Sequence, residues 1–490
     1  MSSLQDKTVS GLFWSFLQKI GSRSVHLLTT ILLARVLLPS DFGLIGMLSI
    51  FIALGQALMN GGFSEALLRK KEVDEEDYSS VFYINLIISA FLYLLLFLGA
   101  PWIGEFYHQA LLVPLTRTLG LVFIINAFSY VQETRLQREM RFKTLMWAHV
   151  PSTILSGIVA ILMAFQGYGV WSIVAQQIVV RLAYAIQIWI FSKWSPLRRL
   201  NIAKAKTLFS FGSRLMLSTI VGAVYGNAYL MVIGRFFSPS LLGFYQTANN
   251  LVEYPAFTFT QVVTSVTFPA FSTMQDDNMR LKVNYRRTIQ QLLFWMTPIF
   301  ILAGVLATPL FRLVFTAKWL PAVSYFRWIC VAGVFYPINS YVLTILNVKG
   351  RSDVFLRLEI IRCAIATIGI IVTIPLGIKA VVIFQVFNAV VVFFLNSYYS
   401  GRFIGYRIFQ QVKDLLPTLM LGISVGGAVL GLDTLVSFLP DVLRVICGSV
   451  FGIGLYWLGA HLLKFSPWLE FKQILSRYPT IFFSNRAAVS

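Results

Sequence analysis

The sequence predicts an all-α polytopic membrane protein with about fourteen transmembrane helices. Three observations predict this fold. Of the 490 residues, 57% are hydrophobic and only 12% are charged, which is about half of the charged fraction of a soluble protein. Apolar runs of about 20 residues, the length that crosses a bilayer, recur along the chain and are continuous rather than alternating, so a β-barrel is not expected. A helix-breaking motif near residue 39 also returns 200 residues later.

Fourteen apolar segments are long enough to span a membrane. They are residues 10–37, 42–63, 80–101, 111–132, 146–166, 170–192, 208–235, 241–272, 287–315, 322–347, 354–376, 379–401, 414–434 and 441–462. The connections between them are too short for a soluble domain. The longest are Glu65–Asp77, Lys193–Lys206 and Thr273–Arg286.

The repeated motif indicates an internal duplication. Its residues recur with an offset of 200: Arg35, Pro39, Ser40 and Gly43 return as Arg235, Pro239, Ser240 and Gly243. Proline ends the first helix of each pair, and glycine lets the next helix begin close by. Six predicted spans separate the starts of the two repeats, so both enter the membrane from the same side and form a parallel repeat.

The duplication predicts four parts of the chain. Residues 1–200 form an N-terminal six-helix lobe and residues 201–405 form a C-terminal six-helix lobe. Residues 406–465 add two transmembrane helices, and residues 466–490 form a cytoplasmic tail. We expect the function to lie between the two lobes.

Basic residues predict the orientation of the chain. The net charge is +20, but the Lys and Arg residues are spread between apolar segments rather than gathered in a nucleic-acid-binding domain. Alternate connections hold 27 and 5 of them. Because basic loops stay in the cytoplasm, both termini are expected there, in a multi-pass membrane protein. The motifs around residues 39 and 239 then lie outside, where Arg35 and Arg235 are expected to anchor at the membrane interface.

Polar residues within the predicted spans mark the candidate site, because charges at membrane depth are costly and need a function or a partner. The first span carries Lys19, Arg23, His26 and Thr30, whose spacing places them on one helical face. Few acids are available at this depth in the first lobe. We therefore favour a water-filled cationic cavity over buried ion pairs, although Lys19 could equally extend to the interface.

Further spans contribute polar candidates to the same cavity. They are Arg214 and Tyr225 of the seventh span, Gln56 and Asn60 of the second, Asn249 and Asn250 of the eighth, Arg181 of the sixth and Arg362 of the eleventh. Glu253 is the most isolated acid of the second lobe, and is either an ion-pair partner of a basic residue such as Arg214 or a site of cation coupling. Glu359 and Arg362 are expected to pair, being three residues apart on one helix.

A cationic cavity with amide and hydroxyl groups suits an anionic amphiphile that carries sugars. Enzyme chemistry is not indicated. The sequence has no phosphate-binding loop, no metal-ligand cluster and no nucleophile triad, and its four histidines are scattered. Three cysteines lie in apolar segments without metal spacing. No cofactor and no metal are predicted.

Several short motifs resemble one known family. They are Lys7-Thr8-Val9-Ser10-Gly11-Leu12-Phe13-Trp14, Leu33-Ala34-Arg35, Phe42-Gly43-Leu44, Gly243-Phe244-Tyr245, Phe268-Pro269-Ala270-Phe271 and Gln275-Asp276-Asp277. In this order and spacing they resemble the bacterial polysaccharide transporter (Wzx) family. This family belongs to the multidrug/oligosaccharidyl-lipid/polysaccharide exporter superfamily, and the chain is most similar to its exopolysaccharide branch, which includes the colanic acid exporters.

The resemblance implies a flippase that moves undecaprenyl-diphosphate-linked oligosaccharide between leaflets by alternating access. It implies contact with membrane lipids, coupling to Na⁺ or H⁺, and contact with polysaccharide polymerase machinery. Under this hypothesis Lys19, Arg23, His26 and Arg214 hold the diphosphate, and Asn60, Tyr225, Asn249 and Asn250 face the sugars. Arg181 and Arg362 are further lining candidates, and Glu253 is the candidate for ion coupling.

Two alternatives remain at this stage. A multidrug/cation antiporter of the same superfamily would require acidic residues in the cavity, whereas basic residues predominate. A membrane polysaccharide polymerase or ligase would require a large outward loop, whereas each predicted outward connection is short.

Overall fold

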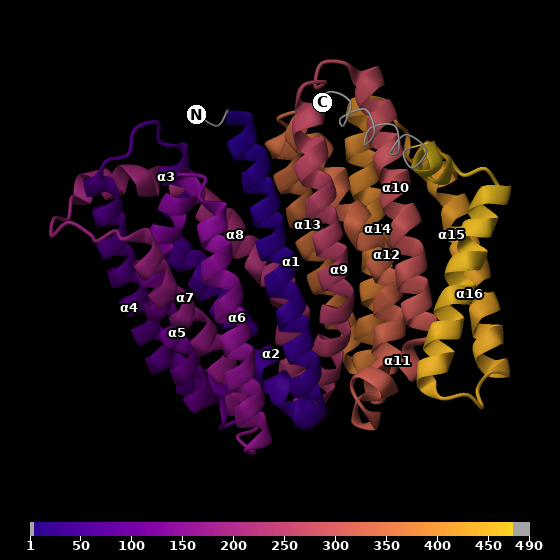
Figure 1. Cartoon of the computed structure of the whole chain (residues 1–490), viewed down its shortest axis with the longest axis horizontal. Coiled ribbons are helices and arrows are strands. Elements are labelled where there is room, and N and C mark those ends of the chain that lie inside the picture. Colours follow the sequence, from indigo (N-terminus) through magenta and orange to yellow (C-terminus); the bar gives the residue numbers. More distant parts are fainter. Residues whose placement is uncertain (1–3, 474–490) are drawn as a thin grey trace, which may run out of the picture. The chain divides into compact units, whose positions relative to one another are not determined.

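The computed structural model describes residues 4–473, which are helical apart from short connections (Figure 1). The helices are α1 (Leu4–Val36), α2 (Pro39–Asn60), α3 (Phe63–Arg69), α4 (Glu75–Phe106), α5 (Leu112–Arg138), α6 (Phe142–Phe165), α7 (Val170–Ser192), α8 (Ile202–Phe236), α9 (Pro239–Ser272), α10 (Asn278–Val305), α11 (Ala307–Val314), η1 (Ala317–Trp319), α12 (Pro321–Val348), α13 (Ser352–Thr373), η2 (Ile374–Leu376), α14 (Ile378–Ile404), α15 (Ile408–Leu435) and α16 (Asp441–Leu462). The predicted all-α fold is confirmed.

Each of the fourteen predicted spans corresponds to a long helix, and the part of the chain described contains twelve helices that are long and apolar enough to cross a membrane. The two long helices outside those twelve are α1 and α9. Both are interrupted by polar residues, among them Arg23 in α1 and Asn250 in α9. Two helices that carry candidate site residues, α1 and α9, are therefore not among the twelve.

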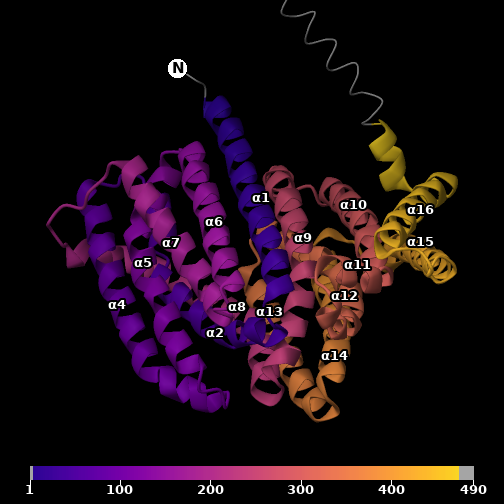
Figure 2. The same cartoon turned by 60° about the horizontal axis from the view of Figure 1, so that its bottom comes forward.

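The chain divides into two compact units, Met1–Gln246 and Thr247–Ser490. In the first unit α4, α5, α7, α6 and α1 contact one another in series, and α2 contacts α5, α7 and α8 (Figure 2). In the second unit α10 contacts α12 and α15, α14 contacts α12 and α13, and α16 contacts α11 and α15. The expected lobe boundaries at residues 200 and 405 concern the sequence repeat and stay a prediction.

The repeated motif has the same secondary structure in both copies. α1 ends at Val36 and α2 begins at Pro39, while α8 ends at Phe236 and α9 begins at Pro239. Both prolines occupy the first residue of a helix, where their missing N–H removes no helical hydrogen bond. The guanidinium of Arg235 lies 5.3 Å from the centre of the Phe106 ring, a cation–π contact between α8 and α4. This contact is compatible with the anchoring role expected of Arg235.

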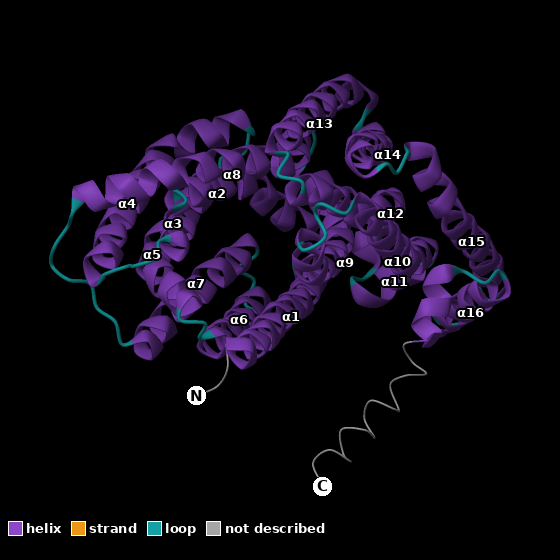
Figure 3. Cartoon of the chain, turned by 90° about the horizontal axis from the view of Figure 1, so that it is seen from above, coloured by secondary structure: helices purple, strands orange, loops and turns teal. Residues whose placement is uncertain are grey.

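The connections of the first unit differ from the prediction at two places. Residues 65–69 were expected in a turn but belong to α3, which follows a break at Gly61 and Gly62. These two residues have φ values of 51° and 71°, which glycine adopts without the steric cost of a side chain. The link after α7 is also shorter than expected, because α8 begins at Ile202. Figure 3 shows the loops between these helices.

The link between α7 and α8 is fixed to the start of α4. The backbone N–H of Leu197 donates to Ser79 Oγ at 2.8 Å, and that of Asn201 donates to Ser80 Oγ at 2.9 Å. Lys204 Nζ lies 2.5 Å from a carboxylate oxygen of Asp74. The α7–α8 link is therefore an ordered connection in contact with α4.

Candidate functional site

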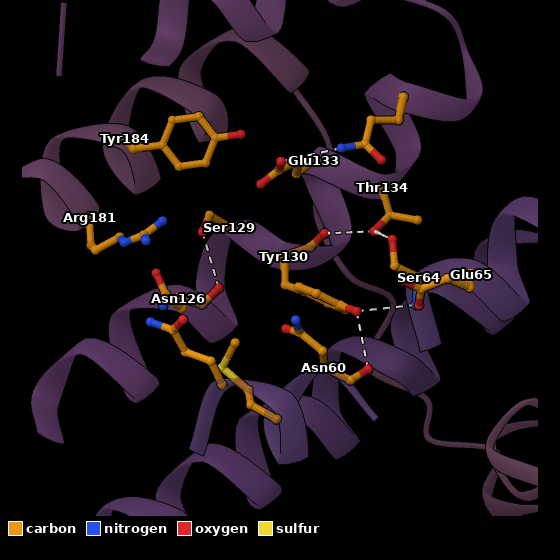
Figure 4. A pocket seen from close by; sticks show the side chains of 13 residues that line it. Asn60, Ser64, Glu65, Asn126, Ser129, Tyr130, Glu133, Thr134, Arg181 and Tyr184 are labelled. Atoms are coloured by element: carbon orange, nitrogen blue, oxygen red, sulfur yellow. Dashed lines mark hydrogen bonds between the residues drawn. The ribbon is translucent and has the colours of Figure 1, made fainter. Parts of the chain in front are cut away.

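A polar pocket of about 310 Å³ lies among α2, α3, α5 and α7 of the first unit (Figure 4). Its volume is at the lower end of the range for small-molecule sites. It is lined by Gln56, Met59, Asn60, Ser64, Glu65, Asn126, Ser129, Tyr130, Glu133, Thr134, Gln137, Arg181 and Tyr184. Most of these side chains are polar, although the helices that carry them are mainly apolar.

Helical periodicity accounts for the α5 side of the pocket. Asn126, Tyr130, Glu133 and Gln137 are separated by 4, 3 and 4 residues, which places them on one face of α5. The break at Gly61–Gly62 ends α2 and turns the chain into α3, so that Ser64 reaches the same pocket. The polar face of α5 and the break between α2 and α3 thus bring polar side chains to the same pocket.

Tyr130 joins the broken end of α2 to α5. Its hydroxyl donates to the carbonyl oxygen of Asn60 at 3.1 Å and accepts from the backbone N–H of Ser64 at 3.2 Å. The hydroxyl of Ser64 lies 2.8 Å from that of Thr134. These hydrogen bonds satisfy backbone groups that the helix break would otherwise leave unpaired. One wall of the pocket is therefore held in place from both sides of the break.

The charged residues form the other wall. Gln137 Nε2 donates to Glu133 Oε1 at 3.3 Å. In Figure 4 the guanidinium of Arg181 points into the pocket, and the Tyr184 hydroxyl points toward Glu133. Among the side chains described, Arg181 forms no ion pair. Donors and acceptors thus remain available to a bound molecule.

Tyr184 is the most buried polar side chain of this wall. It is 2% exposed, and its hydroxyl faces the Glu133 carboxyl and interacts with it, although the two groups do not reach regular hydrogen-bond geometry. Its ring lies 4.0 Å from the imidazole ring of His149 on α6, measured between centroids. Because a buried hydroxyl is most stable with a full hydrogen bond, this group would gain from a ligand that hydrogen-bonds to it.

Two predicted site residues, Asn60 and Arg181, line the pocket. The predicted stripe of α1 lies elsewhere, on a part of α1 that differs from its contact face with α6. That contact face includes Gly21 and Thr29, which lie against Val150 and Gly157. Thr30 donates to the backbone carbonyl of His26 at 2.8 Å, as its position four residues later allows. Arg23 is half-buried, and Lys19 and His26 are exposed.

Arg214 and Tyr225 belong to α8. Tyr225 is half-buried. The side chain of Arg214 lies outside the described part of the structure, so its role in the site stays a prediction. Tyr225 does not line the polar pocket.

Asn249, Asn250 and Glu253 lie on α9, in the second unit. Asn249 Nδ2 donates to Glu253 Oε2 at 2.9 Å, and Asn249 Oδ1 accepts from Gln385 of α14 at 3.2 Å. Asn250 is half-buried. The pocket described above therefore does not include these three predicted residues.

Arg362 and Glu359 form the predicted ion pair within α13. The Nη1 and Oε1 atoms are 2.7 Å apart, and the two side chains are 17% and 22% exposed. Arg362 is thus close to a carboxylate on its own helix, whereas Arg181 is not. Both arginines were predicted to line the cavity, but only Arg181 lines the polar pocket.

The sequence interpretation missed Glu133, Tyr130 and Tyr184. It ended the fourth span at residue 132, whereas α5 continues to Arg138 and carries Glu133 into the pocket. A signal was available, because the 4, 3, 4 spacing of the polar residues on α5 equals that of Lys19, Arg23, His26 and Thr30. Glu133 is an acid that the sequence interpretation did not consider.

The residues described contain no group of three or more His, Cys, Asp or Glu side chains that could hold a metal ion. The cysteines Cys330, Cys363 and Cys447 are free. The longest connection between α-helices in residues 4–473 runs from residue 193 to 201. The large loop that a polymerase or ligase would require does not occur in this part of the chain.

Comparison with known proteins indicates the relatives of the chain. A family model described as polysaccharide biosynthesis protein matches residues 32–324. The chain is 24% identical over 355 residues to the teichuronic acid biosynthesis protein TuaB of Bacillus subtilis, covering 72% of this chain and 74% of that protein. It is 25% identical over 458 residues to the succinoglycan biosynthesis transport protein ExoT of Rhizobium meliloti, covering 90% of each.

A solved structure shares the fold. The lipid II flippase MurJ in an inward closed conformation superposes with a TM-score of 0.75 at 15% sequence identity. The match covers 93% of this chain and 98% of that chain. At this identity the similarity establishes an all-α polytopic membrane architecture.

Proposed function

The chain belongs to the polysaccharide biosynthesis protein family, whose model matches more than half of it, and we propose that it moves lipid-linked oligosaccharide across a membrane. The relatives named for teichuronic acid and succinoglycan biosynthesis support a polysaccharide precursor as the cargo. The fold shared with a lipid II flippase supports transport of a lipid-linked molecule. The protein acts as a transporter in this proposal, and alternating access of two six-helix lobes moves the cargo.

The polar pocket among α2, α3, α5 and α7 is the observation that carries this proposal. Polar side chains at membrane depth are costly and mark transport pathways. The pocket supplies amide, hydroxyl, carboxylate and guanidinium groups, of which Asn126, Glu133 and Arg181 are examples. These groups suit the hydroxyl-rich part of an oligosaccharide, which must leave water to cross the bilayer.

The diphosphate of the cargo requires positive charge. We assign it to the stripe of Lys19, Arg23 and His26 on α1, together with Arg214 on α8. Guanidinium groups bind phosphate oxygens in pairs, and an ammonium group adds a compact charge. The undecaprenyl chain would remain in contact with membrane lipids.

The orientation follows from the distribution of basic residues, with both termini in the cytoplasm of a bacterium and the chain in its inner membrane. Glu133 and Gln137 then lie toward the cytoplasmic end of α5, which has Arg138 as its last residue. The pocket would thus receive its cargo from the cytoplasmic leaflet. Contact with a polysaccharide polymerase would follow on the outer side.

Ion coupling is a further part of the proposal. Glu253 is its candidate residue, and its carboxylate accepts a hydrogen bond from Asn249 within α9. Entry of Na⁺ or H⁺ at this carboxylate would supply the free energy for directional transport. Replacing Glu253 with Gln should then abolish the dependence of transport on one ion gradient while leaving exchange without a gradient intact.

A multidrug/cation antiporter is the second candidate function. One observation favours it: Glu65 and Glu133 place two carboxylates on the polar pocket, and carboxylates attract organic cations. A multidrug transporter in an inward-facing conformation also shares the fold, with a TM-score of 0.60. If overproduction of the protein raises resistance to cationic dyes in a Glu133-dependent manner, this candidate replaces the first.

The proposed function is tested in proteoliposomes that contain a fluorescent undecaprenyl-diphosphate-linked oligosaccharide. Wild-type protein should accelerate movement of the label between leaflets. Replacing Arg23 with Ala should slow it by roughly tenfold, because a charge-assisted hydrogen bond contributes about 1.5–3 kcal/mol. Arg198→Ala, an exposed change in the α7–α8 link, serves as the control. No acceleration by folded wild-type protein would reject the proposal.

A further inference from the structure

The polar pocket of the first unit has a charge pattern that differs from the α1 stripe. It contains two carboxylates, Glu65 and Glu133, and one guanidinium, Arg181. Its acidic groups therefore outnumber its basic group. A diphosphate carries several negative charges, and like charges within a few ångströms repel strongly where water is scarce. The pocket is consequently unsuited to the diphosphate and to a negatively charged sugar.

The available hydrogen-bonding groups of the pocket match alcohol groups. The Glu133 carboxylate accepts, the Arg181 guanidinium donates, and the Tyr184 hydroxyl can do either. Glu133 accepts a hydrogen bond of 3.3 Å from Gln137 and also faces Tyr184 and Arg181, and its two oxygens have room for a further donor. The hydroxyl of Tyr184 is buried and faces Glu133 without a hydrogen bond of regular geometry, so a sugar hydroxyl between the two groups could bond to both. Neighbouring hydroxyl groups of a sugar present donors and acceptors together. They can therefore donate to the Glu133 carboxylate and accept from the Arg181 guanidinium.

The opposite wall is already satisfied and limits where a ligand can bind. Tyr130 uses its hydroxyl to bridge the carbonyl oxygen of Asn60 and the N–H of Ser64. Met59 adds an apolar surface nearby, suitable for the C–H groups of a sugar ring. A volume of about 310 Å³ suits a small ligand rather than a whole oligosaccharide.

We propose that this pocket is a subsite for one uncharged sugar ring of the cargo, recognised through its hydroxyl groups by Glu133, Arg181 and Tyr184. The proposal rests on the transport of lipid-linked oligosaccharide proposed above and adds the part of the cargo that this pocket reads. In this assignment the α1 stripe and the pocket divide the head group between them. The stripe takes the diphosphate, and the pocket selects cargo by the arrangement of alcohol groups on a sugar.

Binding of simple glycosides to the full-length protein in lipid nanodiscs tests this assignment. The probes are the methyl glycosides of glucose, galactose and mannose, compared with methyl glucuronide and inorganic pyrophosphate. Saturation-transfer NMR measures binding of each probe. At least one neutral glycoside should bind, and methyl glucuronide should bind at least fivefold more weakly than it. Pyrophosphate should not compete with the neutral glycoside.

Variants place the binding in this pocket. Glu133→Gln and Arg181→Gln should each weaken neutral glycoside binding roughly tenfold, since a buried partner of a hydroxyl loses its charge. Tyr184→Phe removes only a hydroxyl and keeps the ring, so it tests the site with little risk to folding. Matched controls are Glu105→Gln and Arg198→Gln, which change exposed residues outside the pocket.

The outcomes separate this inference from the proposed function. If none of the neutral glycosides binds, if methyl glucuronide or pyrophosphate binds more tightly, or if all pocket variants bind as the wild type does, the subsite is overturned. Transport by wild-type protein is measured in parallel with the labelled lipid-linked oligosaccharide. If the wild-type protein transports the cargo and the pocket variants bind glycosides as the wild type does, only the subsite is rejected. Absent transport rejects the proposed function, while the glycoside measurements still decide what the pocket binds.

Discussion

Gly43 and Gly243 pack reciprocally against each other's repeat of the Pro-Ser motif. A Cβ atom on Gly43 would overlap the carbonyl oxygen of Pro239, and a Cβ atom on Gly243 would overlap that of Pro39. Each glycine lies within the first turns of the helix that its own proline begins, α2 or α9. The two copies of the duplicated motif therefore meet backbone to backbone, and each copy makes the same contact with the other.

We expect Gly43→Ala to destabilise the protein markedly. Overpacking typically costs about 1–3 kcal/mol, and here the obstacle is a backbone oxygen, which moves only if the start of α9 moves. Gly243→Ala should have a similar effect, and the double variant should cost less than the sum because both changes strain one contact. The measurement is the midpoint of thermal unfolding in detergent.

Gly222→Ala is the control for this pair. Gly222 lies within α8, and a Cβ there would meet no atom within 4 Å. Alanine should stabilise the helix there by roughly 0.5–1 kcal/mol, because it has less conformational freedom to lose than glycine. Equal midpoints for Gly43→Ala and Gly222→Ala would refute the close contact.

Tyr130→Phe should loosen the broken end of α2. The change removes the hydroxyl that bridges Asn60 and Ser64 and leaves two backbone groups without it. The cost should be about 1–3 kcal/mol, the usual penalty for unpaired buried polar groups. Tyr168→Phe, an exposed change, is the control. Hydrogen exchange of residues 60–66 should accelerate only in Tyr130→Phe, and unchanged protection would contradict the bridging role.

The sequence predicts those features of the fold that depend on local pattern, and it does not predict contacts between distant helices. Apolar length predicted the helices, and a spacing of three residues on one helix predicted the Glu359–Arg362 pair. The Gly61–Gly62 break was missed because the predicted span ran through it to residue 63, and the charged residues that follow were assigned to a turn. The partner of Gly43 was also beyond local pattern, since it depends on which distant helix packs against α2.

The same limit applies to the candidate site. Asn60 and Arg181 were predicted as polar residues inside apolar spans. Glu133 was missed because it lies near Arg135 and Arg138, which made the end of α5 resemble a surface connection. Tyr184 could not be distinguished from other interface tyrosines, because only its burial without a hydrogen bond of regular geometry marks it.

The pH dependence of the α7–α8 link should follow Asp74. The hydrogen bond from Lys204 lowers the pKa of the Asp74 carboxyl to about 2, from 3.8. The contact with Asp74 and Glu76 raises the pKa of Lys204. Because its pKa is lowered, the Asp74 carboxylate stabilises the folded state at a pH above its ordinary pKa of 3.8. This stabilisation is lost as the pH falls through about 2. A raised lysine pKa loses its contribution only as pH rises above its ordinary range, so the contact should be intact near neutral pH.

Asp74→Asn and Lys204→Gln test this contact at neutral pH. Asparagine can still cap α4, so Asp74→Asn removes charge with little change to the cap. Both variants should exchange the amides of residues 197–201 faster than wild type, with the larger effect in Lys204→Gln because it also loses Glu76. Lys206→Gln, an exposed neighbour, should not change exchange. The wild type should lose the protection between about pH 4 and 2, corrected for intrinsic rates, and a pH-independent link would contradict the assignment.

Replacing Arg444 should destabilise the protein more than replacing Arg351, although the two arginines form ion pairs of similar geometry. It binds Asp433 through two nitrogens at 2.9 and 2.7 Å, and the side chains are only 12% and 11% exposed. Arg351 binds Asp353 in the same two-point manner at 2.9 and 2.8 Å, but those side chains are 45% and 50% exposed. Arg444→Ala leaves the Asp433 carboxylate shielded from water, and its cost should exceed 1 kcal/mol and approach the roughly 3–5 kcal/mol of broken buried pairs. Arg351→Ala should cost less than about 1 kcal/mol.

Unfolding midpoints in detergent compare the two variants. Replacing both Arg444 and Asp433 with Leu should recover part of the lost stability, because it removes the uncompensated charge. Equal effects of Arg444→Ala and Arg351→Ala would show that burial does not control the strength of these pairs.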